Sequence, residues 1–125
     1  DVSQGFRGAA HALAPGKILL AAMRPERWPS YLCASRFEAF TPTTIDTPGR
    51  LHTHLQRVRE QGYAVDVEEF RERVCCVAAP IYDSAGRVLA TLAVSTANSK
   101  ISCWPYAGRH RRPPRSSRAS TPSPP

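Results

Sequence analysis

Two strand-forming runs joined by a short turn constrain the fold of this chain more than any other feature of its sequence. The runs are VCCVAAPIYD, residues 74–83, and RVLATLAVS, residues 87–95, and Ser84, Ala85 and Gly86 lie between them. Both runs are rich in β-branched and small apolar residues, and the connection between them is short. The pattern therefore predicts an antiparallel β-hairpin.

The expected turn, with Ser84 and Ala85 at its centre, fixes the strand register and the two faces of the hairpin. It pairs the following residues: Val77 with Leu92, Ile81 with Val88, and Cys76 with Ala93. One face is apolar and is expected to be core: Val77, Ala79, Ile81, Val88, Ala90, Leu92 and Val94. The other face is small and partly polar: Val74, Cys76, Ala78, Thr91, Ala93 and Ser95. This second face either leaves room for a ligand or receives a closely packed helix, and the sequence favours neither.

Helices are expected before the hairpin. Pro15 suits the start of a first helix over residues 17–23, which Pro25 ends, and a shorter helix is expected over residues 29–35. A third helix has the clearest signals, because Thr47 can cap it and Gly62 can take the left-handed closing position. Its apolar stripe recurs at helical spacing: Leu51, Leu55 and Val58.

Length, charge and hydropathy limit the class of protein. A chain of 125 residues with a formal net charge of +7 is long enough for one small domain. The apolar runs at residues 18–23 and 74–81 are shorter than the roughly 20 residues of a membrane-spanning helix. We expect a soluble, cytoplasmic protein with no membrane partner. The chain begins at Asp1 rather than at a methionine, so we expect it to be a piece of a longer protein.

The motifs of catalytic and metal sites are not formed. The four cysteines have no metal-ligand spacing, and His52 and His54 are two residues apart on a helix, where they are expected to be solvated. Gly16 and Lys17 lack the remainder of a phosphate-binding loop. The sequence therefore implies no metal, no cofactor and no enzyme activity.

The composition changes after residue 104. Residues 105–125 contain five arginines, six prolines and no acidic residue, whereas the first 104 residues carry twelve basic and ten acidic side chains. A segment of this composition cannot bury enough apolar surface to fold. The sequence predicts a domain over residues 1–104 and a disordered tail over residues 105–125. The arginines leave open a second function, nonspecific nucleic-acid binding by the tail.

Four segments in order resemble the effector-binding domain of the isocitrate-lyase-regulator (IclR) family of bacterial transcription regulators. They are HALAPGKILLA, FTPTTI, LHTHLQRVREQGYAVDVEE and VCCVAAPIYDSAGRVLATLAVS, and the resemblance spans roughly residues 5–100. It implies an α/β (α+β), GAF-like domain in which helices flank an antiparallel sheet. It also implies a homodimer or homotetramer that contacts DNA through an N-terminal winged helix-turn-helix, which this chain lacks.

The resemblance further implies where a small-molecule effector binds. The pocket residues of the family match positions in the loop entering the first helix, in the GYAVD segment and on the hairpin: Ala14, Pro15, Asp66, Cys76, Ala93 and Ser95. Ala93 stands where many relatives have a second serine, so one hydrogen bond to a ligand carboxylate is missing. Without the family context, Asp66 beside Glu68 and Glu69 is typical of a solvated surface.

The expected effector is a small organic acid or an aromatic catabolite. Val94, Ser95 and Thr96, together with FTPTTI, resemble the subgroup that senses aromatic-acid catabolites of the β-ketoadipate pathway. A buried carboxylate repels an anionic group, so Asp66 is expected to bind a hydroxyl or keto-hydrate of the ligand.

The resemblance ends near Lys100. There the family continues into a long amphipathic helix, whereas this chain turns to Arg, Pro and Ser, as an out-of-frame reading of GC-rich DNA would. We therefore expect a truncated or frameshifted regulator.

Overall fold

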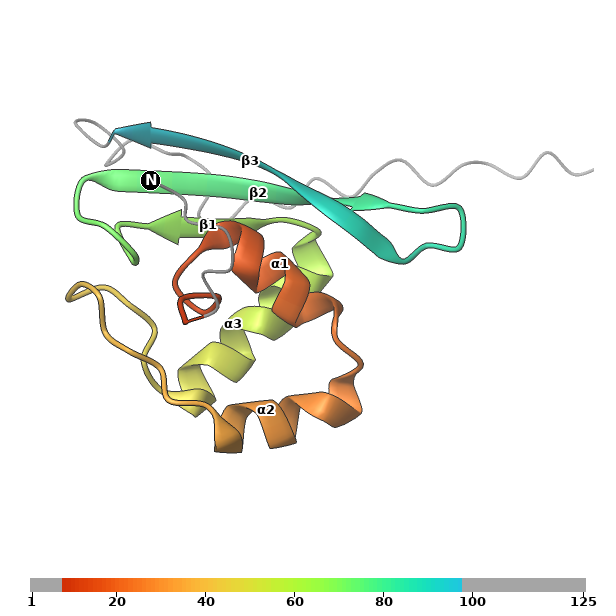
Figure 1. Cartoon of the computed structure of the whole chain (residues 1–125), viewed down its shortest axis with the longest axis horizontal. Coiled ribbons are helices and arrows are strands. Elements are labelled where there is room, and N and C mark those ends of the chain that lie inside the picture. Colours follow the sequence, from red (N-terminus) through yellow and green to blue (C-terminus); the bar gives the residue numbers. More distant parts are fainter. Residues whose placement is uncertain (1–7, 98–125) are drawn as a thin grey trace, which may run out of the picture.

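A computed structural model of the chain describes residues 8–97, which form two layers. The first layer is a three-stranded antiparallel sheet with the strand order β1-β2-β3, and the helices lie on one side of it (Figure 1). The elements follow the chain in this order: α1 (Ala14–Ala22), a short 3-10 turn (Pro25–Arg27), α2 (Trp28–Ala34), α3 (Pro48–Gln61), β1 (Ala64–Val67), β2 (Val74–Tyr82) and β3 (Val88–Ala97). The α+β fold class expected from the sequence is confirmed.

Helix α3 matches its sequence signals. Thr47 occupies the cap position with extended backbone, although its side chain makes no capping hydrogen bond, and Pro48 begins the helix. Gly62 closes the helix with a φ of 82°, a left-handed conformation that glycine adopts without steric cost. The predicted stripe of Leu51, Leu55 and Val58 is buried against the rest of the core.

The hairpin of β2 and β3 forms with a different register from the one expected. Cys76 lies opposite Ser95 rather than Ala93, and Val77 lies opposite Val94 rather than Leu92. The connection is longer than a two-residue turn because the Asp83 carboxylate accepts hydrogen bonds from two backbone N–H groups of the loop. Gly86, with a φ of 75°, makes this loop possible.

The expectation about the core face of the hairpin is wrong. Leu92 and Val94 on the large apolar face are 65% and 63% exposed, whereas Cys76 and Ala78 on the small-residue face are buried. Figure 1 shows the reason, since the helices of residues 8–97 lie on the other face of the sheet. Small side chains let a helix approach the strands closely, and α1 occupies that face. Of the two alternatives left open, the structure has the packed helix.

One apolar cluster joins α1, α2, α3 and the sheet. Its buried members are Ala14, Ile18, Leu20, Ala21, Trp28, Leu32, Ile45, Leu51, Leu55, Val58, Ala64, Cys76 and Ala78. Val88, which was expected to share a face with Ile81, pairs with Tyr82 beside a bulge and packs against this cluster. No helix within residues 8–97 is both long and apolar enough to cross a membrane. The tail at residues 105–125 and the boundary at residue 104 lie outside the described residues.

Candidate functional site

Three of the predicted site residues lie side by side across the sheet. Asp66 on β1 pairs with Cys76 on β2, and Cys76 pairs with Ser95 on β3. Directly paired residues of an antiparallel sheet project to the same face. Asp66 and Cys76 are buried, whereas Ser95 at the edge strand is exposed. Ala93 lies one step along the same face, opposite Ala78. We call Asp66, Cys76 and Ser95 the polar row.

The start of α1 is held against this part of the sheet by Lys17. Its side chain is fully buried, and its Nζ donates hydrogen bonds to the Val65 carbonyl oxygen at 3.0 Å and to Oε2 of Glu69 at 2.5 Å. Ala14 lies three residues before Lys17, hence on the same face of the helix, and is also buried. The half-buried Pro15 follows it. The first turn of α1 therefore lies over β1, near the polar row.

Burial shifts the pKa of each ionisable group here toward its neutral form. Burial lowers the pKa of Lys17, and the charge and hydrogen bond of Glu69 offset part of that shift. Burial raises the pKa values of Asp66 and Glu69, again opposed by Lys17. Asp66 also accepts a hydrogen bond from the Glu69 N–H at 2.8 Å, which favours its ionised form. The site thus contains two carboxyl groups and one amine that are buried together.

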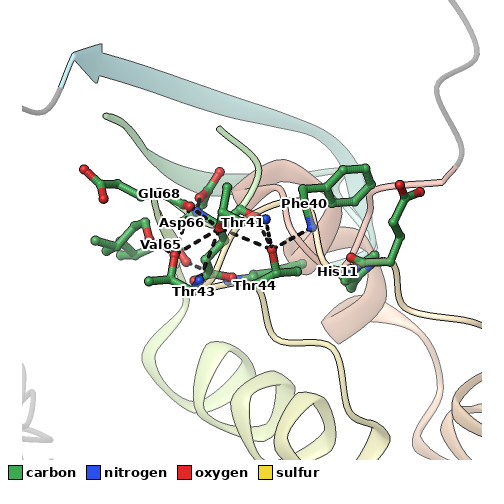
Figure 2. Close-up of polar contacts among 12 residues, drawn as sticks. His11, Phe40, Thr41, Thr43, Thr44, Val65, Asp66 and Glu68 are labelled. Carbon is green, nitrogen blue, oxygen red and sulfur yellow. Dashed lines mark hydrogen bonds and ion pairs between the residues drawn. The ribbon is translucent and has the colours of Figure 1, made fainter. Parts of the chain in front are cut away.

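A threonine-rich loop fixes the turn that carries Glu69. Figure 2 shows Thr41, Thr43 and Thr44 against the end of β1. The Thr41 hydroxyl donates to the Glu68 carbonyl oxygen at 2.6 Å, and the Thr44 hydroxyl donates to that of Glu69 at 2.6 Å. Glu68 has a φ of 57°, an uncommon conformation for a residue with a side chain. The hydroxyls stabilise this conformation by satisfying its carbonyl groups.

His11 packs against two phenylalanine rings near the same loop. It is buried, and its Nε2 donates to the Glu38 carbonyl oxygen at 2.8 Å. The imidazole contacts the rings of Phe37 and Phe40 at centroid distances of 5.2 and 5.8 Å. The segment before α1 is therefore fixed to the segment before the threonine loop.

Two expectations about charged and polar residues are corrected here. Lys17, considered only for a phosphate loop, is a buried ion-pair partner; a signal was available, because it falls in the same helical stripe as Ala14 and Ala21. His54, expected to be solvated, is half-buried, and its Nε2 is covered and has no hydrogen-bond partner within residues 8–97. Burial, with Lys17 and Arg57 nearby, lowers the pKa of His54 to about 4.

Two hollows in the described part of the chain, of about 190 and 410 Å³, are lined by residues other than the six predicted site residues. Within the same residues, no group of three His, Cys, Asp or Glu side chains is placed to hold a metal ion. In the polar row, Asp66 and Cys76 are buried on the face that α1 packs against, beside Lys17 and Glu69, whereas Ser95 is exposed.

Together these features define an α+β domain with a buried polar site between its first helix and an antiparallel sheet. Residues 2–104 match the protein family described as "Bacterial transcriptional regulator IclR C-terminal", and the chain belongs to that family. The family resemblance noted in the sequence is confirmed.

Similar proteins are regulators that are longer than this chain. The HTH-type transcriptional regulator XynR of Escherichia coli is 38% identical over 97 residues, which cover 78% of this chain and 38% of XynR. The Pca regulon regulatory protein of Pseudomonas putida is 41% identical over 96 residues, covering 77% of this chain and 33% of that protein. The chain thus spans between a third and two fifths of the length of these relatives. The two sequence identities are too similar to assign the chain to one subgroup of the family.

A solved structure with a similar fold is the inducer-binding domain of the PobR transcription factor from Acinetobacter, a double mutant in complex with 3-hydroxybenzoic acid. The TM-score is 0.70 at 28% sequence identity, covering 77% of this chain and 56% of that chain.

Proposed function

We propose that this chain is the effector-sensing part of an IclR-type transcription regulator, and that its effector binds on the small-residue face of the sheet. The residues proposed to contact the effector are Ala14, Pro15, Asp66, Cys76, Ala93 and Ser95. The observation that carries the proposal is the polar row, in which Asp66, Cys76 and Ser95 come from three different strands and share one face.

The ligand proposed is a small organic acid or an aromatic catabolite that carries a hydroxyl group. The 3-hydroxybenzoic acid bound to the PobR domain belongs to this class. Burial raises the pKa of Asp66, so its carboxyl group can share a proton with a hydroxyl group of the ligand. Cys76 and Ala93 are small, which leaves space for a ring once the covering helix moves.

We infer the sensing mechanism from the position of α1, which packs over the buried part of the polar row. A ligand at Asp66 competes with the arrangement in which Lys17 pairs with Glu69, because all three groups interact electrostatically. Binding thus selects a state in which the start of α1 is displaced from β1. That displacement is the signal passed to the remainder of the regulator.

The remaining roles belong to the whole regulator. We propose that it is not an enzyme, that it acts in the cytoplasm as a homodimer or homotetramer, and that it contacts DNA through a winged helix-turn-helix outside this sequence. The chain would then make no sequence-specific DNA contacts of its own, because base edges are read by a recognition helix.

Calorimetry with 3-hydroxybenzoate as the probe tests the proposal on the 125-residue chain. Asp66→Ala is expected to weaken binding by about 1–3 kcal/mol, the cost of losing a buried hydrogen bond. Cys76→Leu should abolish binding by filling the space. Glu72→Gln removes an exposed carboxylate as the control and should leave affinity unchanged. Unchanged affinity in both site variants, or no saturable binding at all, contradicts the proposed site.

A further inference from the structure

The larger of the two hollows described above lies beside the first three turns of α3 and shares no lining residue with the polar row. It has a volume of about 410 Å³ and is lined by Ile45, Gly49, Arg50, Thr53, His54 and Arg57. Five of these six residues belong to one face of α3, because positions 49, 50, 53, 54 and 57 fall within less than half of the helix circumference. We propose that this hollow binds a small oxyanion, such as a phosphate or a dicarboxylate.

Two arginines supply the charge. Arg50 and Arg57 are seven residues apart, so they lie about two turns apart on the same side of the helix. Arg50 pairs with Asp46 at 4.0 Å, with side chains that are 66% and 43% exposed, and Arg57 has no ion pair within residues 8–97. The Arg57 guanidinium is thus available to a ligand, and that of Arg50 can exchange its long, solvent-screened contact with Asp46 for one. Their planar N–H groups match the oxygens of phosphate and carboxylate.

The histidine in the lining has an unused hydrogen-bonding group. The Nε2 atom of His54 is covered and has no partner in the described structure, and such atoms are rare in folded proteins. The imidazole lines the hollow, so the proposal requires a ring rotation that turns one nitrogen toward the bound oxyanion. The neutral ring can then donate a hydrogen bond to an oxyanion.

The start of α3 also offers backbone donors on this side. The first N–H groups of a helix have no partner within the helix, and the Thr47 side chain does not cap them. A Cβ atom added at Gly49 would meet no atom within 4 Å, so the backbone there is open to a ligand. These groups add to the two arginines and to His54, and they share no residue with the proposed effector site.

Titration of the 125-residue chain with inorganic phosphate, at constant ionic strength, tests the site. Saturable 1:1 binding by calorimetry is expected, together with a shift of the His54 imidazole NMR signal. Arg50→Gln and Arg57→Gln should each raise the dissociation constant at least fivefold. Arg71→Gln removes an exposed arginine elsewhere and should leave the dissociation constant unchanged. Asp66→Ala should also leave it unchanged, so failure of the effector site does not affect this result.

A parallel titration with malonate identifies the class of oxyanion, since the anion bound more tightly is the better match. The site is refuted if phosphate and malonate both fail to saturate, if Arg71→Gln weakens binding as much as the α3 variants do, or if the His54 signal does not move. Both α3 arginines are exposed, and circular dichroism of the variants confirms that a loss of binding is not a loss of fold.

Discussion

Replacing Lys17 by methionine tests the buried ion pair that holds α1 on the sheet. Methionine is similar in length but leaves the Glu69 carboxylate without its cation and the Val65 carbonyl oxygen without its donor. Removal of one partner of a buried ion pair typically costs about 3–5 kcal/mol. Small domains are stabilised by only about 5–15 kcal/mol, so Lys17→Met is expected to lose a large part of the free energy of unfolding.

Glu69 determines how this loss depends on pH. Burial raises its pKa above the ordinary value of 4.5, and loss of Lys17 raises that pKa further. A carboxyl group whose pKa is higher in the folded state binds more protons when folded, so its ionisation costs stability as the pH rises through the folded pKa. The loss in Lys17→Met should therefore be full at neutral pH and should shrink as the pH falls toward 4.5.

The double variant Lys17→Met, Glu69→Gln separates charge from packing. It removes the Glu69 charge that Lys17→Met leaves unpaired, so its remaining cost is about 1–2 kcal/mol for the unsatisfied Val65 carbonyl oxygen, together with the lost attraction between Lys17 and Asp66. Urea unfolding followed by circular dichroism at pH 5 and pH 7.5 measures Lys17→Met, Glu69→Gln and the double variant. The reasoning fails if Lys17→Met loses less than about 1 kcal/mol, or if the double variant loses the sum of the two single losses.

Three further predictions concern packing, hydrogen bonding and pH. Gly16→Ala should cost about 1–3 kcal/mol in thermal unfolding, because the new Cβ would overlap the Ala10 backbone; Gly49→Ala, whose Cβ meets no atom, should not destabilise the chain. Thr44→Val keeps the side-chain shape but removes the bond to Glu69, and urea unfolding should show a loss of about 1–3 kcal/mol. Burial and nearby cations lower the pKa of His54 from 6.5 to about 4, so stability should fall as the pH drops through this range, by about 1–2 kcal/mol after solvent screening; a pH series that His54→Gln does not flatten contradicts this.

The helices were predictable because their signals are local. Pro48 and Gly62 bound α3, and its apolar spacing depends on neighbours within one or two turns. Strand β1 was missed, since its four residues are too few to show an alternating pattern. The hairpin register was wrong by two residues, and an even error keeps the paired residues up to Ile81 and Ala90 on their predicted faces; only beyond the bulge does Val88 change face. Cys76 and Ser95 were therefore placed together correctly.

The core face and the buried charges depend on distant parts of the chain. Leu92 is larger than Ala78, so residue size indicated the wrong face as the core. The face that is buried is the one on which α1 packs. The partner of Lys17 lies 52 residues away in sequence, so no local pattern predicts that Glu69 is this partner. The proposed contacts of Asp66 came from the family resemblance, and the structure adds its place in the polar row.

The threonine loop ties together two segments that are far apart in sequence, and it does so through backbone carbonyl groups. Thr41 and Thr43 both donate to the Glu68 carbonyl oxygen, 27 and 25 residues away. Neither segment can open alone without breaking these hydrogen bonds. The connection between α2 and α3 and the turn after β1 therefore behave as one cooperative unit of local unfolding. Because the acceptors are main-chain atoms, the side chains of that turn can vary without breaking the unit.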